Sequence, residues 1–438
     1  MQDKIAPERL IRNQIFTHTL EQRFFTWYRR TFSVEEIEQS KILQWFFGAM
    51  LLVFFAAFSS WTRSSAITLE SVSKGLHRCW PYFQSCGEWY FLQALPYGYS
   101  QSTLYMAFFG IMLLIVFLMW KRDWVLAHML MTVLFVWEFV LLFILSGEIS
   151  GNYDYYHIIL TLILLFLPFK IFFLKLTFVL FYFLAATIKI HEGWILGTYF
   201  TSLQTGLPIF PDAIAPLVTN FVIFEQIVGS WFLMSSNKIY QRLTLIYLVV
   251  FHLYSGILVE YRYPATVLPG LLILFGPLYQ HTQVPLNRKS LVGWMLVVLL
   301  FMLQSVPFLI PGYQKITLEG NKYGLYMFEA NHQCVSTVEV VKKDGKRKTI
   351  RKESNSARSR CDPYAYWFQL NQICRRSHEV EYISWNFDHS INGGPFYRIV
   401  DEKNACNLNY KAFSHNDWIK TPKNGAEIIG YPVKNIYN

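Results

Sequence analysis

The sequence lacks the short motifs that would indicate a zinc site or N-linked glycosylation. Its six cysteines form no Cys-x-x-Cys pair, which argues against a structural zinc site. No Asn-x-Ser/Thr sequence occurs, and this absence favours a bacterial protein. The first 41 residues lack the short apolar core and cleavage site of a signal peptide. We therefore expect no bound metal and no cleaved leader.

Charged residues are scarce, and apolar residues are abundant. Charged residues make up 16%, apolar residues 53% and aromatic residues 18% of the 438-residue chain. Soluble proteins are nearer about 45–50% apolar. A net charge of +10 is also found in nucleic-acid-binding proteins. Here most lysines and arginines of the apolar region lie in short loops, as in membrane proteins. We expect membrane lipid, and no nucleic acid, as a partner.

Nine apolar runs of about 17–23 residues follow, and each is long enough to cross a bilayer as a helix. They lie at 42–59, 103–120, 125–146, 156–174, 176–192, 216–235, 243–260, 265–281 and 292–310. A tight cytoplasmic turn over Lys170–Lys175 is expected between the fourth and fifth runs. The sequence predicts a polytopic α-helical membrane protein whose domain of about nine transmembrane helices covers residues 42–310.

The loops and cysteines predict which end of the molecule faces outward. The loops at 60–102, 147–155 and 193–215 are long or poor in Lys and Arg, which is typical of the outer side. Cysteines confined to one side indicate disulfides in an oxidising compartment, but spacing does not select the pairing. The six candidates are Cys79, Cys86, Cys334, Cys361, Cys374 and Cys406. We expect an integral protein of the bacterial inner membrane, or of the endoplasmic reticulum membrane in a eukaryote, with a cytoplasmic N-terminus.

The two ends of the chain differ from the apolar region. Residues 1–41 interleave arginines with large apolar residues, a pattern typical of an amphipathic helix on the cytoplasmic membrane surface. Residues 311–438 are polar, and Asp344-Gly345 is a hairpin turn signal. A helix at 363–376 and strands at 380–387 and 395–401 complete a small α+β extracytoplasmic domain, which we expect to depend on its disulfides.

Ionisable residues inside a membrane are costly and mark candidate functional positions. Lys189 ends the fifth run and His157 opens the fourth, so both are expected near the outer boundary of one helix pair. A partly desolvated lysine can act as a base, and a nearby histidine can share its proton. The alternative is structural: Lys189 reaches toward the lipid headgroups, and His157 caps its helix.

Further ionisable residues have weaker claims. His252 and Glu225 either line a polar cavity or join hydrogen bonds between helices. His128 and Glu138 are interpreted as members of internal pairs. The basic stretch at 342–360 either attracts an acidic peptide or anionic lipid or forms a solvated hairpin.

The residues around Lys189 resemble a known family. Residues 189–194 read KIHEGW, similar to the segment carrying the base lysine of vitamin K-dependent γ-glutamyl carboxylases, a few residues before a tryptophan. Tyr156-His157 resembles the site of the family's catalytic histidine in the preceding helix. Phe251-His252 resembles its Phe-His pair in a later helix. The chain is thus identified as similar to bacterial members, the horizontally transferred transmembrane domain group.

The resemblance continues past the last apolar run and covers about residues 40–410. Residues 321–328, the hairpin at 343–346, Ser-Ile-Asn at 390–392 and Arg-Ile-Val-Asp at 398–401 resemble family segments in the same order. Residues 372–374 resemble the segment whose cysteine is bridged to the first outer loop. This likeness implies a disulfide between Cys374 and Cys79.

The resemblance implies an enzyme and its reagents. Reduced vitamin K, a naphthohydroquinone, would be oxidised to its epoxide while CO2 is added to a glutamate of a peptide or protein, with O2 consumed and no metal. Lys189 would deprotonate the hydroquinone with help from His157. The pocket for quinone and substrate would include His252, Glu225, Tyr156 and Trp194.

Two departures keep another function open. The chain stops soon after the family-like strands, so propeptide-directed modification is not expected, and Tyr156 stands where the family commonly has Asn. The alternative is a quinone- or lipid-binding membrane protein of the same fold that does not carboxylate. A transporter is the weakest alternative, because the apolar runs show no obvious internal repeat.

Overall fold

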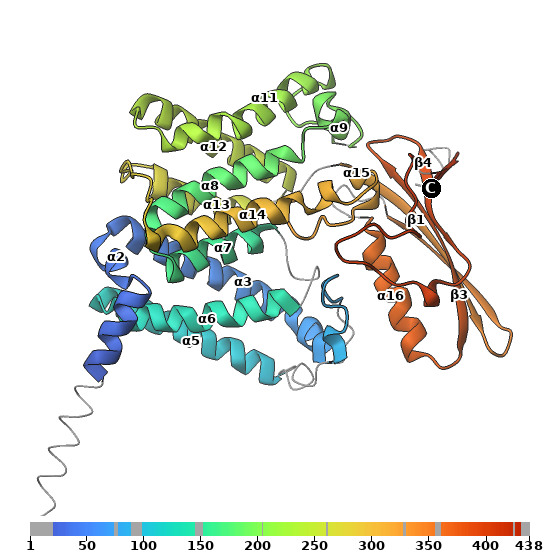
Figure 1. Cartoon of the computed structure of the whole chain (residues 1–438), viewed down its shortest axis with the longest axis horizontal. Coiled ribbons are helices and arrows are strands. Elements are labelled where there is room, and N and C mark those ends of the chain that lie inside the picture. The colour runs from blue at the N-terminus through green and yellow to red at the C-terminus, as the bar shows by residue number, and fades with distance from the viewer. Residues whose placement is uncertain are drawn as a thin grey trace, which may run out of the picture.

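A bundle of long helices carries a small sheet domain at one end (Figure 1). The computed structural model describes residues 21–73, 78–88, 99–144, 152–203, 205–259, 262–326, 330–354, 361–423 and 425–430. Within these residues, each of the nine predicted apolar runs coincides with a helix. The helices are α3 (Lys41–Ser73), α5 (Tyr99–Lys121), α6 (Trp124–Ile144), α7 (Asn152–Phe166), α8 (Lys170–Thr187), α11 (Ala215–Ile227) continued by η3 (Gly229–Met234), α12 (Lys238–Val259), α13 (Arg262–Phe275) and α14 (Leu291–Leu309).

Six segments of the described chain are long and apolar enough to cross a membrane. They are Lys41–Trp61, Ser100–Lys121, Trp124–Leu142, Lys170–Thr187, Asp212–Met234 and Arg288–Leu309. The helices α7 and α13, with 15 and 14 residues, are shorter than the roughly 17–25 residues of a typical span. In the segment Lys170–Thr187, 83% of the residues are buried within the protein, whereas only 22% are buried in the segments from α5 and α14. Helix α8 is therefore central, and α5 and α14 are peripheral.

The predicted turn between the fourth and fifth runs lies earlier than expected. Helix α7 ends at Phe166, and α8 begins at Lys170 after Phe169 adopts a left-handed φ of 56°. Pro168 explains the early stop, because proline lacks the N–H that would continue the helix. Lys170 is thus a buried helical residue, whose Nζ donates to the carbonyl oxygens of Phe32 at 2.9 Å and Leu167 at 2.8 Å. The prediction of a turn over Lys170–Lys175 was wrong.

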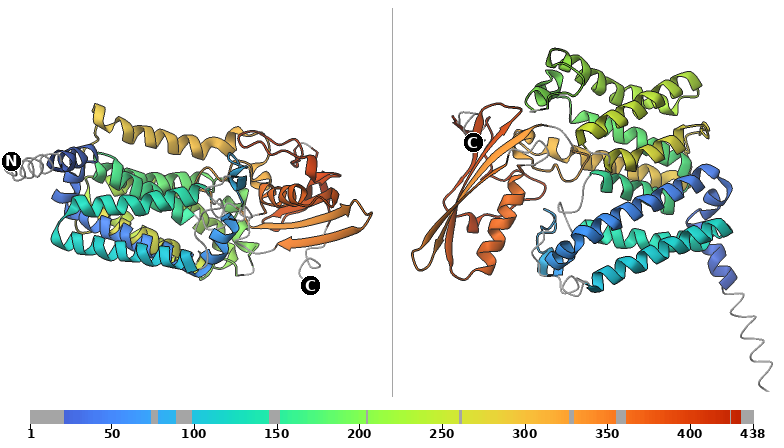
Figure 2. Two further views of the ribbon diagram at one scale, coloured as in Figure 1. Left: turned by 90° about the horizontal axis from the view of Figure 1, so that it is seen from below. Right: turned by 180° about the vertical axis from the view of Figure 1, so that it is seen from behind.

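The N-terminal segment closes the bundle end opposite the sheet domain, as Figures 1 and 2 show. Residues 21–31 are helical, and α2 (Val34–Gln39) follows. Glu36 of α2 accepts hydrogen bonds from the backbone N–H groups of Phe169 and Lys170, each at 2.8 Å. Its carboxylate therefore supplies hydrogen-bond acceptors for backbone N–H groups at the start of α8 that have no partner within the helix. Residues 1–20 of the predicted amphipathic segment lie outside the described residues.

The C-terminal domain is an antiparallel five-stranded sheet in the order β2-β1-β3-β4-β5. Its elements are β1 (His332–Lys342), β2 (Arg347–Ser354), α16 (Pro363–Arg376), β3 (Val380–Ile391), β4 (Phe396–Glu402) and β5 (Glu427–Ile429). Gly345 turns the β1–β2 hairpin with a φ of +81°, as the Asp-Gly signal predicts. Helix α16 has the predicted bounds, and β3 and β4 confirm the two predicted strands.

Three disulfides join cysteines that lie close in sequence. They are Cys79–Cys86, Cys334–Cys361 and Cys374–Cys406. The expected bond between Cys79 and Cys374 was wrong, because each has a nearer partner. The cysteine loop at 78–88 nevertheless contacts α16, since the Tyr364 hydroxyl donates to the Cys79 carbonyl oxygen at 2.6 Å. The cysteine loop and the sheet domain therefore share one end of the molecule, as predicted.

Candidate functional site

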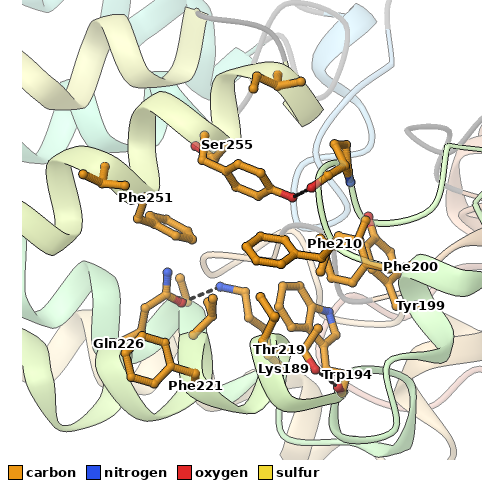
Figure 3. Close-up of a pocket in the computed structure, with 18 of the residues that line it drawn as sticks. Lys189, Trp194, Tyr199, Phe200, Phe210, Thr219, Phe221, Gln226, Phe251 and Ser255 are labelled. Carbon is orange, nitrogen blue, oxygen red and sulfur yellow. Dashed lines mark hydrogen bonds between the residues drawn. The ribbon is translucent and has the colours of Figure 1, made fainter. Parts of the chain in front are cut away.

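A cavity of about 520 Å³ opens among α8, α11 and α12, beneath the short helices α9 (Glu192–Ile195) and α10 (Thr198–Thr201). Its volume lies in the range of about 300–1,000 Å³ found for small-molecule sites. Figure 3 shows aromatic side chains converging on it from several of these elements. They include Trp194, Tyr199, Phe200, Phe210, Phe221 and Phe251. The walls therefore suit a flat, apolar ligand.

Lys189 projects into this cavity from the end of α8 (Figure 3). Its backbone N–H donates to the Ala186 carbonyl oxygen at 2.9 Å, two residues after the helix ends. The residue is 5% exposed. Its Nζ donates to Oε1 of Gln226 at 2.7 Å and lies 5.3 Å from the centre of the Trp194 ring. Lys189 lies two residues beyond the apolar segment Lys170–Thr187, and its burial lowers the pKa of the amine to about 7.

The segment after Lys189 builds the aromatic wall. The His191 side chain accepts from the Gly193 backbone N–H at 3.1 Å and so caps α9. The Trp194 carbonyl oxygen accepts from the Thr219 hydroxyl of α11 at 2.6 Å. The Trp194 and Tyr199 rings are stacked, with centres 5.6 Å apart and planes 13° apart. These contacts hold two rings parallel beside the lysine amine.

Gly193 lies where the sheet domain meets this segment. A Cβ atom built on Gly193 would lie 2.2 Å from Nδ2 of Asn392. Asn331 Nδ2 donates to the carbonyl oxygen and the hydroxyl of Ser202, each at 3.1 Å. The end of the sheet thus packs directly on the segment of α9 and α10 that covers the cavity.

Of the other predicted pocket residues, Tyr156 and Trp194 line the cavity. Tyr156 is 1% exposed, and its hydroxyl accepts from the Tyr263 hydroxyl at 3.2 Å. His252 lies one layer behind the wall, where its Nε2 is 2.7 Å from the hydroxyl of Tyr182, a lining residue. Glu225 is absent from the described lining, and its neighbour Gln226 takes that place.

His157 faces a different part of the bundle. Its Nδ1 lies 2.9 Å from a carboxylate oxygen of Glu138 on α6, and both side chains are at most 1% exposed. Its ring also packs on Phe54 of α3, with centres 4.4 Å apart. His157 is not among the described residues that line the cavity. The described side-chain contacts of His157 are thus with Glu138 and Phe54, whereas the Lys189 amine contacts Gln226.

The prediction that Glu138 and His128 belong to internal pairs is confirmed, although they do not pair with each other. His128 lies 2.8 Å from the Tyr28 hydroxyl through Nδ1 and 2.9 Å from the Leu165 carbonyl oxygen through Nε2. Both contacts are buried in the bundle. His128 therefore joins the N-terminal helix to α6 and α7.

Sequence reasoning missed Gln226 and the rings of the 199–210 segment. A glutamine within an apolar run is a costly polar group that needs a partner, so Gln226 carried a usable signal. The rings of Tyr199, Phe200 and Phe210 carried none, because aromatic residues are frequent throughout the chain. Their role depends on a loop that folds back over the bundle.

The cavity offers one basic group within an apolar enclosure. Among the described lining residues, Lys189 is the single ionisable cation, and none is Asp, Glu or His. No cluster of three His, Cys, Asp or Glu side chains suited to a metal ion occurs in the described chain. The arrangement can therefore accept a proton from a planar ligand bearing an acidic hydroxyl.

Comparison with models of protein families, with curated proteins and with solved structures finds no match.

Proposed function

We propose that this protein is a membrane enzyme that deprotonates a naphthohydroquinone with Lys189 and couples its oxidation to the carboxylation of a peptide glutamate. The observation that carries the proposal is a buried lysine amine that faces an aromatic cavity whose described lining contains no Asp or Glu. The flat fused rings of a naphthohydroquinone suit a cavity lined by aromatic side chains. Its acidic hydroxyl matches a neutral amine.

The overall reaction balances with the reagents that the family resemblance implies. The hydroquinone and O2 give the quinone epoxide and water. One γ C–H bond of a glutamate breaks, the proton leaves, and a C–C bond forms to CO2. Lys189 takes the first proton from the hydroquinone hydroxyl. The aromatic enclosure excludes water, which would otherwise compete for base and carbanion.

The membrane arrangement forms part of the same proposal. All nine helices would cross or enter the bilayer, with the N-terminus in the cytoplasm and the sheet domain outside. Lys121, Arg122 and Lys238 lie at helix ends away from the sheet domain, in accord with the positive-inside rule. Three disulfides accord with an oxidising compartment at the other end.

The test uses purified protein in detergent with reduced vitamin K, a short glutamate-rich peptide and labelled bicarbonate. We expect acid-stable label in the peptide and quinone epoxide in the same tube. Lys189→Met should abolish both, because it removes the amine while keeping an apolar side chain of similar length. Retention of wild-type activity in this variant would refute the assignment.

Lys175→Met is the matched control, since Lys175 lies on the same helix at the opposite end. Its Nζ donates to the Gln280 carbonyl oxygen and lies 4.2 Å from the Tyr279 ring centre, away from the cavity. A folded Lys175→Met protein should keep its activity. Loss of activity in both variants to the same extent would mean that α8 is merely sensitive to substitution.

The second candidate function is binding of a quinone or lipid without carboxylation. The pairing of His157 with Glu138 favours it, because the Lys189 amine then contacts Gln226 rather than the expected histidine. Epoxide without peptide label would retain the oxidative half-reaction. Saturable quinone binding without either product would favour the binding protein.

A further inference from the structure

Lys189 is held by an amide rather than a carboxylate. Oε1 of Gln226 accepts from Nζ at 2.7 Å, and Gln226 is 3% exposed. Its backbone carbonyl oxygen accepts from the Ser230 hydroxyl at 2.8 Å, which adds a second hydrogen bond one turn along the helix. Figure 3 shows the amide and the amine meeting at the cavity wall. The contact is thus built between a central helix and α11.

The adjacent Glu225 makes this choice of partner informative. A carboxylate is available one residue away, yet it turns from the cavity toward Gly229. The titratable groups of the described walls beside Lys189 are phenols, with one imidazole behind them, and the Glu225 carboxylate interacts electrostatically with the lining phenol of Tyr247. Tyr182 of α8 pairs with His252 of α12, and Tyr156 of α7 pairs with Tyr263 of α13. The described walls therefore hold the amine without a counter-ion.

We infer that Gln226 is the positioning residue of Lys189, and that its amide NH2 group donates to the oxygen from which Lys189 takes the proton. The oxygen end of the amide faces Nζ, so its NH2 end is turned to the cavity side, as drawn in Figure 3. One side chain would then aim the base and bind the acidic hydroxyl of an aromatic ligand. This inference rests on the proposed function for the identity of the ligand.

This role depends on the Gln226 amide being uncharged. An amide oxygen accepts a hydrogen bond from either an amine or an ammonium group. A carboxylate at the same place would form an ion pair and hold Lys189 in its ammonium form. A lysine held in that form cannot accept the ligand's proton. Gln226 thus orients the Lys189 amine without holding it in its protonated form, so the amine can still accept a proton.

The decisive experiment measures the reactivity of Lys189 without any turnover. Full-length protein in detergent is treated with formaldehyde and cyanoborohydride between pH 6 and 10, and dimethylation of Lys189 is quantified by mass spectrometry. The rate follows the fraction of neutral amine. Gln226→Glu should move the midpoint upward by about 1–3 pH units. Glu225→Gln is the matched control and should leave the midpoint unchanged.

Two results would overturn the inference. The first is a Gln226→Glu midpoint equal to that of the wild type in a protein of native elution volume. The second is a downward shift of similar size in Glu225→Gln, which would show that the charge carried by the helix, rather than contact with Gln226, controls the amine.

Gln226→Met provides a second test if Gln226→Glu fails to fold. The probe is 2-methyl-1,4-naphthohydroquinone under anaerobic conditions, followed by quenching of tryptophan fluorescence. Loss of the NH2 donor should weaken binding about three- to tenfold, and unchanged affinity would refute the donor role. A wild-type protein that does not bind the probe refutes the proposed function and with it the donor role. The dimethylation result would still decide the contact between Gln226 and Lys189.

Discussion

Two buried ionisable sites in the helical bundle differ in their partner and in the space beside them. Lys189 contacts the neutral amide of Gln226 and faces a cavity of about 520 Å³. His157 contacts the carboxylate of Glu138 and packs against the Phe54 ring. Both residues are at most 5% exposed. Burial alone therefore does not separate them.

The difference indicates which buried group is free to react. A buried histidine that contacts a carboxylate has a charged partner, although Nε2 of His157 itself has no described hydrogen-bond partner. Removing one member of such a pair leaves the other without compensation. An amine beside an amide has no counter-ion, and its cavity admits a second reactant. The first arrangement stabilises the fold, whereas the second suits proton transfer. A family resemblance that assigns Lys189 and His157 to one site does not make this distinction.

The largest effect on stability is expected at the sealed pair. Glu138→Ala should lower the free energy of unfolding by about 3–5 kcal/mol, because it strands His157 in the bundle. Gln226→Met should cost only about 1 kcal/mol. Thermal unfolding in detergent, followed by tryptophan fluorescence, ranks the two. Glu138→Gln should recover part of the loss, since its amide still offers His157 an acceptor. Equal costs for Glu138→Ala and Gln226→Met would break the comparison.

Local patterns predicted much of this architecture. Long apolar runs are sufficient to identify bundle helices, and the Asp344-Gly345 turn identifies a hairpin, because each signal lies within the segment it describes. Pro168 could also have located the turn before α8. Peripheral and central helices are harder to separate, since α8 and α14 are both apolar enough to cross a membrane but differ greatly in burial.

The partner choices were not predictable, because they depend on how helices rotate against one another. Glu225 and Gln226 are adjacent in sequence and point about 100° apart around the helix, and only packing decides which of them faces Lys189. The same holds for His157, which turns to Glu138 while Tyr156 turns to the cavity. Cys79 and Cys374 illustrate it again, since their segments meet through Tyr364 but their sulfurs bond elsewhere.

A third buried site, in the sheet domain, sharpens the comparison through pH. His389 lies 3.1 Å from His332 and 2.8 Å from the Ile316 carbonyl oxygen. Burial, and then the neighbouring His332, lower the pKa of His389 well below its ordinary value of 6.5. The unfolded chain therefore binds a proton near pH 6.5 that the folded domain does not. Stability from this site is fully present above pH 6.5 and is lost as the pH falls below it.

The measurement for this site is thermal stability at pH 7.5, 6.5 and 5.5. Wild type should lose stability across the lower interval, and His389→Gln should show a smaller loss. The difference between the two proteins isolates the histidine from carboxyls such as Glu319, whose pKa is raised by burial. If the thermal stability of both proteins falls equally with pH, His389 is not the titrating group.

The smallest effect on the Lys189 amine is expected from His252, which lies between the two types of site. Its partner is the Tyr182 hydroxyl at 2.7 Å, so it has neither a counter-ion nor direct access to the cavity. His252→Leu should cost about 1 kcal/mol from the lost hydrogen bond. It should leave the dimethylation midpoint of Lys189 in place, because Gln226 still holds the amine. A midpoint shift as large as that of Gln226→Glu would instead make His252 part of the proton-accepting group. The reactive site would then extend across α12. The contrast between Lys189, which faces a cavity, and buried histidines such as His157 would no longer hold.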